Sequence, residues 1–136
     1  MSGYCHPNMQ ILVVDDEKDM CWALQRIIEA EGHEVSVAYD AATALHLVQR
    51  QSFDLCLVDA KLPDMEGTEL LDRLHCSHPA LPCVLMSGYL CADDEVVQTR
   101  LRGGRVSTFI GKPFLLADVR NAVRSGRPVR ELVPAL

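Results

Sequence analysis

The sequence lacks long apolar runs and closely paired cysteines, and aromatic residues make up only 5% of its 136 residues. No apolar run approaches the roughly 20 residues that a membrane-spanning helix needs. The polar N-terminus also lacks the basic-then-apolar order of a signal peptide. We therefore expect a cytoplasmic protein with no membrane contact.

The six cysteines form no Cys-x-x-Cys motif, and a disulfide framework is not expected in a chain of this size and context. The stretch His75-Cys76-Ser77-His78, with Cys83 beyond it, brings possible metal ligands together in sequence. This stretch crosses a helix end and a turn that contains proline, so its side chains are not placed to surround one metal ion tetrahedrally. A zinc-type site is not expected here.

Charge is unevenly distributed along the chain, which carries a formal net charge of −6. Of its 19 acidic residues, 17 precede residue 100, whereas eight of its 13 lysines and arginines lie from Arg100 to Arg130. This basic region is either a solvated face or a docking surface for an acidic partner. Direct nucleic-acid binding is not expected, because helix-turn-helix, zinc-finger and aromatic-basic stacking motifs are missing.

Four short apolar runs have the composition of strands that are buried on both faces of a sheet. They are Ile11–Val14, Leu55–Val58, Cys83–Met86 and the less regular Val106–Ile110. Val35 and Val37 alternate with polar neighbours and predict a fifth, short strand near an edge.

Helical patterns separate these strands, at residues 18–31, 41–50, around 70–74, within 93–101 and from about 115 to 124. Asp40 is a good N-cap for the second helix, and Gly32 closes the first. Five strands that alternate with helices predict an α/β fold, in which one parallel five-stranded sheet carries helices on both faces.

The length predicts a single domain, and the sequence has no internal repeat or low-complexity tract. We expect an N-terminal extension at 1–8, the domain at 9–124 and a loose tail at 125–136, which contains Gly126, Pro128 and Pro134. No second domain is expected.

Polar residues stand where the apolar runs stop. Asp15 and Asp16 follow the first run, Asp59 the second, Ser87 the third and Lys112 the fourth. If the strands are parallel neighbours, these residues converge on one rim of the sheet, where open α/β sheets bind their ligands. Carboxylates packed so closely repel one another and favour a hard cation such as Mg²⁺.

These motifs resemble those of the receiver domain of bacterial two-component response regulators, over about Met9 to Arg124. They read ILVVDDE, LVDAKLPDMEG, LMSGY and FIGKPF. The resemblance implies a flavodoxin-like (βα)5 fold with strand order 2-1-3-4-5. It also implies a signalling phosphoacceptor that catalyses only its own phosphorylation and dephosphorylation, and not an enzyme for another substrate.

Carried over by the resemblance, Asp59 is the aspartate phosphorylated by a sensor histidine kinase or phosphotransfer protein. Asp16 would bind Mg²⁺ directly and Asp15 mainly through water. Asp59 itself and the backbone carbonyl of Lys61 would be further ligands.

The resemblance also assigns the remaining site residues. Ser87 would bond the phosphoryl group, Phe109 would swing inward as Ser87 moves, and Lys112 would pair with phosphoryl oxygens. A cis peptide is usual before the residue equivalent to Pro113. The last strand and its flanking helices would form the output surface, and homodimerisation through Arg100 to Arg124 is compatible with the sequence but not demanded by it.

Two other functions stay open. A haloacid-dehalogenase-type phosphatase needs a second aspartate two residues after its nucleophile, where this chain has Lys61, and a capping insertion. A receiver-like module that ignores phosphate usually loses one of the site residues, and this chain keeps them. Taken singly, Ser87 could merely end a strand, Phe109 could be fixed core and Lys112 could be a loop cation.

The chain departs from the family pattern in two places. The distance from Ser87 to Lys112 is longer than usual, and the extra residues fall in Arg100 to Arg105. The glycines there predict a fourth helix that is short, displaced or mobile. Lys61 and Tyr89 flank the path of attacking water in the family, and their bulk suggests slow hydrolysis of the phosphoryl group.

Overall fold

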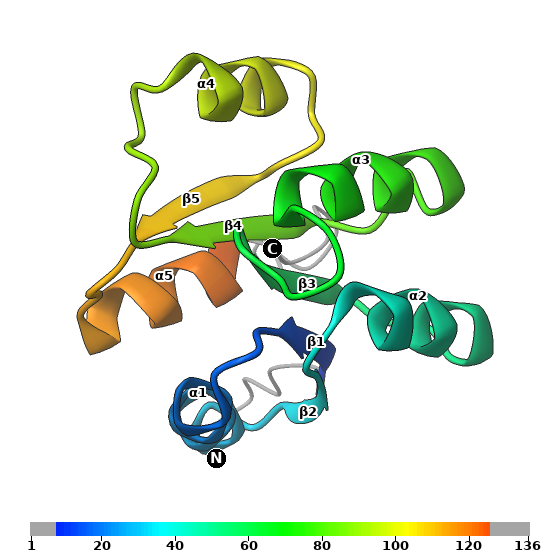
Figure 1. The fold of residues 1–136 in the computed structure, drawn as a ribbon. Helices are drawn as coiled ribbons and strands as arrows, with labels where there is room; N and C mark the ends of the chain where they lie inside the picture. Colours follow the sequence, from blue (N-terminus) through cyan, green and yellow to red (C-terminus); the bar gives the residue numbers. More distant parts are fainter. Residues whose placement is uncertain (1–7, 126–136) are drawn as a thin grey trace, which may run out of the picture.

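The computed structural model describes residues 8–125 and contains one parallel sheet with strand order β2-β1-β3-β4-β5 (Figure 1). The strands are β1 (Gln10–Val14), β2 (Glu34–Ala38), β3 (Leu55–Asp59), β4 (Cys83–Ser87) and β5 (Thr108–Gly111). The α/β class and the strand order expected from the sequence are confirmed. Apart from Asn8 and Ser125, the expected N-terminal extension and C-terminal tail lie outside the described residues.

Five helices connect the strands and cover both faces of the sheet (Figure 1). They are α1 (Lys18–Ala30), α2 (Ala41–Arg50), α3 (Gly67–Ser77), α4 (Glu95–Arg102) and α5 (Leu116–Ser125). Helices α1 and α5 lie on one face, and α2, α3 and α4 lie on the other. None of the helices within residues 8–125 is both long and apolar enough to cross a membrane.

The strands divide the core into two layers because successive side chains point to opposite faces. Ile11 and Val13 of β1 pack toward α1 and α5, whereas Leu12 and Val14 pack toward α2, α3 and α4. All four side chains are fully buried. A strand enclosed in this way needs an apolar residue at every position, which explains the continuous apolar run of the sequence.

The helix ends follow the capping residues of the sequence. Asp40 accepts a hydrogen bond from the backbone N–H of Thr43 at 2.7 Å and caps α2, as predicted. Gly32 follows the last turn of α1 with a φ of +92°, a left-handed conformation that glycine adopts without a steric penalty.

The start of β5 differs from the prediction. The strand begins at Thr108 rather than Val106. Val106 is buried, but its N–H donates to the carbonyl oxygen of Arg100 at 3.3 Å. Val106 therefore closes the end of α4, whereas the N–H of Ser107 already donates to the carbonyl oxygen of Cys83 on β4 at 2.8 Å.

Helix α4 is short, as predicted, with eight residues that end before Gly103 and Gly104. It is nevertheless attached to its neighbour. The Arg100 guanidinium donates two hydrogen bonds to the carboxylate of Asp72 on α3, at 3.1 and 2.8 Å. This bidentate ion pair ties α4 to α3, and Arg105 lies 3.9 Å from the same carboxylate.

Candidate functional site

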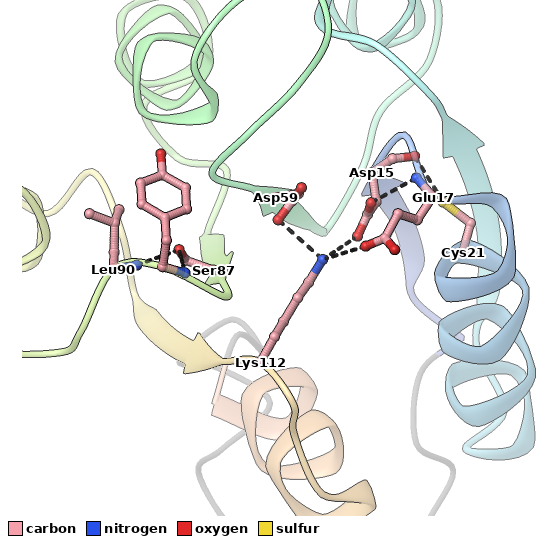
Figure 2. A network of polar contacts seen from close by, with 8 residues as sticks. Asp15, Glu17, Cys21, Asp59, Ser87, Leu90 and Lys112 are labelled. Carbon is pink, nitrogen blue, oxygen red and sulfur yellow. Dashed lines mark hydrogen bonds and ion pairs between the residues drawn. The ribbon is translucent and has the colours of Figure 1, made fainter.

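The predicted site residues meet at the carboxyl edge of the sheet (Figure 2). Asp15 directly follows β1, Asp59 ends β3, Ser87 ends β4 and Lys112 directly follows β5. Because β1, β3, β4 and β5 are parallel neighbours, residues that are distant in sequence come together there. The expected convergence on one rim is present.

Lys112 lies at the centre of this group and reaches between Asp59 and Asp15 (Figure 2). Its Nζ is 2.8 Å from Oδ2 of Asp15, 3.2 Å from Oδ1 of Asp59 and 3.6 Å from Oε1 of Glu17. The peptide bond between Lys112 and Pro113 is cis, as expected. The backbone N–H of Lys112 donates to the carbonyl oxygen of Ser87 at 2.7 Å, which links the ends of β4 and β5.

Three carboxylates form an acidic cluster in which one oxygen from each of Asp15, Asp16 and Asp59 lies within 4.8 Å of the others. Asp15 and Asp59 are buried, and Asp16 is exposed. Asp15 is oriented by the N–H of Glu17, which donates to its Oδ1 at 3.0 Å. Oxygen ligands from two buried groups and one exposed group fit a hard divalent cation that keeps part of its water shell.

The ionisation of Asp59 and Lys112 is coupled through this geometry. Burial and the neighbouring charge of Asp15 raise the pKa of Asp59, and Lys112 opposes that rise. For Lys112, burial lowers the pKa, but hydrogen bonding and attraction to Asp15 and Asp59 outweigh burial and raise it overall. The ammonium therefore stays charged beside a carboxylate that is unusually easy to protonate.

Ser87 is buried, and its hydroxyl oxygen accepts hydrogen bonds from the loop that follows it (Figure 2). The backbone N–H groups of Tyr89 and Leu90 donate to Oγ at 3.1 and 2.8 Å. Within residues 8–125, no hydrogen bond joins Ser87 to Asp59. The hydroxyl proton remains able to donate to an acceptor that arrives at the site.

Phe109 and Lys61 lie around this centre. Phe109 on β5 is partly buried and packs against the core layer of α2, α3 and α4. Lys61 lines a cavity of about 340 Å³ together with Asp16, Asp59 and Tyr89. The inward swing of Phe109 and the metal-binding carbonyl of Lys61 stay predictions from the resemblance.

Gly67 supports the site through a close approach that sequence reasoning missed. A Cβ at this position would overlap with the backbone carbonyl oxygen of Asp59, and the N–H of Gly67 donates to the carbonyl oxygen of Ala60 at 2.7 Å. The start of α3 is thereby packed directly on the end of β3. In the sequence this residue is the last glycine of the motif LVDAKLPDMEG, which gave no reason for the close contact.

Asp64 is a second residue that the sequence interpretation left without a role. Its carboxylate accepts hydrogen bonds from the N–H groups of Ala41 and Ala42, both at 2.9 Å, and these bonds lower its pKa. The β3–α3 loop is therefore tied to the first turn of α2. An aspartate in a turn commonly caps the helix that follows it. Asp64 instead caps α2, whose first residue lies 23 positions earlier in the sequence.

Comparison with known proteins agrees with the geometry. Residues 11–124 match the family model described as the response regulator receiver domain. The transcriptional regulatory protein ZraR of Escherichia coli is 35% identical over 91 residues, which are 67% of this chain and 21% of that protein. This chain thus spans about a fifth of the length of ZraR. Sporulation initiation phosphotransferase F of Bacillus subtilis is 29% identical over 123 residues, which cover 90% of this chain and 97% of that protein.

Solved structures with the same fold include a CheY-like receiver domain protein from Methanospirillum hungatei. It has a TM-score of 0.78 and 32% identity, and the match covers 86% of this chain and 91% of that chain. The receiver domain of NtrX from Brucella abortus has a TM-score of 0.77 and 33% identity, covering 85% and 96%. The chain belongs to the family of response regulator receiver domains.

Proposed function

We propose that Asp59 accepts a phosphoryl group from a sensor histidine kinase or a phosphotransfer protein, in a reaction that requires Mg²⁺. The observation that carries this proposal is the position of the Asp59 carboxylate. It is a buried acidic group at a strand end, 3.2 Å from the Lys112 ammonium and within one cluster with Asp15 and Asp16.

In the proposed reaction, a carboxylate oxygen of Asp59 attacks phosphorus in line with the leaving group. The new O–P bond forms as the bond from phosphorus to the donor breaks, and the product is an acyl phosphate. Mg²⁺, when bound by the carboxylates of Asp15, Asp16 and Asp59 and the carbonyl of Lys61, would supply positive charge for the phosphoryl oxygens.

Lys112 provides a second positive charge beside the same carboxylates. Before transfer its ammonium neutralises part of the charge of Asp15 and Asp59. After transfer the phosphoryl group adds a charge of about −1.5 to −2 beside it, and the ammonium pairs with a phosphoryl oxygen. Lys112 needs no large displacement for this role, because it already contacts the carboxylate that is modified.

Phosphorylation at Asp59 would then change the surface formed by α4, β5 and α5. Ser87 would move to donate its hydroxyl proton to the phosphoryl group, and Phe109 would occupy the space that Ser87 leaves. The chain would act as a signalling phosphoacceptor in the cytoplasm, turning over no substrate besides its own phosphoryl group. Its target would be a protein that binds this surface. A second copy of the chain is one candidate.

The test is the intact mass after incubation with acetyl phosphate, with and without Mg²⁺. We expect the wild type to gain one phosphoryl group only with Mg²⁺, and Asp59→Asn to gain none. Asp93→Asn is the matched control, because Asp93 is exposed in the β4–α4 loop and outside the acidic cluster. If the wild type gains no mass in any condition, the alternative of a phosphate-independent interaction module replaces this proposal.

A further inference from the structure

The β4–α4 loop, which follows Ser87, is tied to the rest of the site by a hydrogen bond between side chains. The phenol of Tyr89 donates to Oε1 of Glu66 at 3.0 Å. Glu66 immediately precedes α3, at the end of the loop that begins after Asp59. The bond therefore joins the loop that follows the expected switch hydroxyl to the loop that follows the expected phosphoacceptor.

Glu66 is the fixed end of this bond. The next residue, Gly67, is packed against the backbone of Asp59, and its N–H is bonded to the carbonyl oxygen of Ala60. Lys61 and Glu66 also pair as an isolated antiparallel bridge. Any adjustment between the two loops must therefore take place mainly on the side of Tyr89.

The Ser87 hydroxyl cannot approach Asp59 without disturbing this arrangement. Its Oγ accepts from the N–H groups of Tyr89 and Leu90, so rotation of the side chain alone would break both bonds. If the loop moves together with Ser87 and keeps those bonds, the Tyr89 phenol shifts relative to Glu66, and the hydrogen bond between them resists that shift. The first route costs the two hydrogen bonds to Oγ. The second route is opposed by the Tyr89–Glu66 bond.

We propose that the Tyr89–Glu66 hydrogen bond is a latch that holds the β4–α4 loop in its unphosphorylated arrangement and lowers the affinity of the site for a phosphoryl group. This inference rests on the proposed function, since it assigns a regulatory contact to the same site. Tyr89 is a positioning residue in this scheme, because it acts through Ser87 and its own loop. The role differs from shielding the phosphoryl group against water, which depends on the bulk of the ring and not on its hydroxyl.

Both side chains of this bond are exposed, so water competes for it. Burial, hydrogen bonding to Glu66 and the charge of Glu66 raise the pKa of Tyr89, so the phenol stays protonated and able to donate at neutral pH. A single net hydrogen bond of this kind corresponds to a factor of about 2 to 10 in an equilibrium constant. The latch would therefore bias the switch without locking it.

The test compares Tyr89→Phe, Glu66→Ala and the double variant with the wild type. Tyr39→Phe is the matched control, because Tyr39 is also a half-exposed tyrosine but lies after β2. The first readout is the Kd for beryllofluoride in the presence of Mg²⁺, by NMR titration, since this anion mimics a phosphoryl group. The second is the hydrogen-exchange rate of the Leu90 amide without either additive.

We expect Tyr89→Phe to bind beryllofluoride about 2 to 10 times more tightly, with faster exchange at Leu90, and Tyr39→Phe to match the wild type. Removing Glu66 also removes a negative charge near the anion, so Glu66→Ala alone does not isolate the latch. The double-mutant cycle does: once Glu66 is gone, Tyr89→Phe should have no further effect.

Two results would overturn the latch while the proposed function stands. One is a wild type that binds beryllofluoride with the same Kd as Tyr89→Phe. The other is full additivity of the effects of Tyr89→Phe and Glu66→Ala on this Kd. A wild type that neither binds beryllofluoride nor gains a phosphoryl group would instead overturn the proposed function, and the latch with it.

Discussion

At the scale of single residues, the balance of charge around Lys112 leaves the acidic cluster with a net negative charge. One ammonium faces Asp15 and Asp59 at hydrogen-bond distance, and Asp16 adds a third carboxylate to the cluster. Lys112 therefore cannot neutralise the group on its own. The remaining negative charge lies at the exposed side, where Asp16 meets solvent, and a divalent ion can enter there without displacing a core side chain.

Asp59→Asn should stabilise the fold at neutral pH in the absence of metal. Burial raises the pKa of Asp59 from its ordinary value of 3.8, so the folded state holds the proton more tightly than the unfolded state. The free energy of unfolding therefore falls as pH rises from about 3.8 through the raised pKa, and it stays lower above it. We expect Asp59→Asn to raise this free energy at pH 7 by roughly 0.5–2 kcal/mol, the range of single stabilising substitutions.

Urea denaturation of both proteins between pH 3 and pH 7 measures the effect, and the difference should vanish below the unfolded pKa. Asp64→Asn is a control with the opposite sign. Hydrogen bonds from Ala41 and Ala42 lower the pKa of Asp64, so its contribution is present above the unfolded pKa and is lost as pH falls through the folded pKa. An Asp59→Asn protein that is less stable than wild type at pH 7 would contradict the prediction.

Gly67→Ala should damage both stability and the site. The added methyl group would overlap with the carbonyl oxygen of Asp59, and backbone atoms cannot move aside as a flexible side chain can. We expect a loss of about 2–4 kcal/mol in the free energy of unfolding. Gly88→Ala is the matched control: its Cβ would lie 3.8 Å from Cβ of Lys112, an ordinary contact, and equal losses in the two variants would contradict this explanation.

The residues that the sequence could predict are those that depend only on strand order. Asp15, Asp59, Ser87 and Lys112 each stand at the end of an apolar run, and parallel neighbouring strands bring such ends together. Gly67 could not be predicted in this way, because its role depends on how closely α3 approaches β3 in space. Likewise, the partners of Asp64 and Tyr89 are 22 or more positions away in sequence, and no local pattern identifies them.

At the scale of elements, α4 is tied to α3 by the carboxylate of Asp72, which pairs closely with Arg100 and also lies 3.9 Å from Arg105. Arg100 is largely buried, with 16% of its side chain exposed, and it bonds Asp72 through two nitrogens. We expect Arg100→Met to lower the free energy of unfolding by about 1 kcal/mol, since half-exposed Asp72 limits the contribution. Hydrogen exchange of the α4 amides should also become faster.

Arg102→Met provides the comparison for that measurement. Arg102 pairs with Glu95 within α4, and both side chains are mostly exposed, so its loss should change stability by less than about 0.5 kcal/mol. Exchange rates that rise equally in both variants would show that the contact with α3 is not what holds α4.

The end of α1 and the start of α2 could be predicted because capping residues mark them, whereas the apolar pattern around residues 70–74 gave no ends for α3, which spans Gly67–Ser77. Asp40 begins α2 in the structure as in the sequence pattern, and Gly32 follows the end of α1. The start of β5 could not be predicted, because an apolar residue before a strand has the same appearance whether it enters the sheet or closes a helix. Val106 does the latter through its bond to Arg100.

At the scale of the whole molecule, Mg²⁺ should stabilise the complete domain, because only the folded sheet brings the three carboxylates together. A ligand at 100 times its Kd adds about 2.7 kcal/mol to the free energy of unfolding. We expect Tm to rise with Mg²⁺ concentration in the wild type and to rise much less in Asp16→Asn. Asp16 is the suitable ligand to remove, because it is exposed and its loss leaves the buried ion pairs of Lys112 in place.

Asp19→Asn is the control for the thermal measurement. Asp19 is exposed on α1 and outside the acidic cluster, so this variant should respond to Mg²⁺ as the wild type does. A shift in Tm that is equal in Asp16→Asn and the wild type would mean that the cation acts elsewhere on the acidic surface.

The bond between Lys112 and Asp15 spans 97 positions of the chain, and this separation has a consequence for biosynthesis. A growing polypeptide displays the three aspartates of the site long before its lysine has left the ribosome, because β5 is the last of the five strands in the sequence. If Asp59 is the acceptor, a nascent or truncated chain offers the kinase an aspartate without its counter-charge. Phosphoryl transfer would thus be confined to finished molecules, and no unfinished copy would take phosphoryl groups from the kinase.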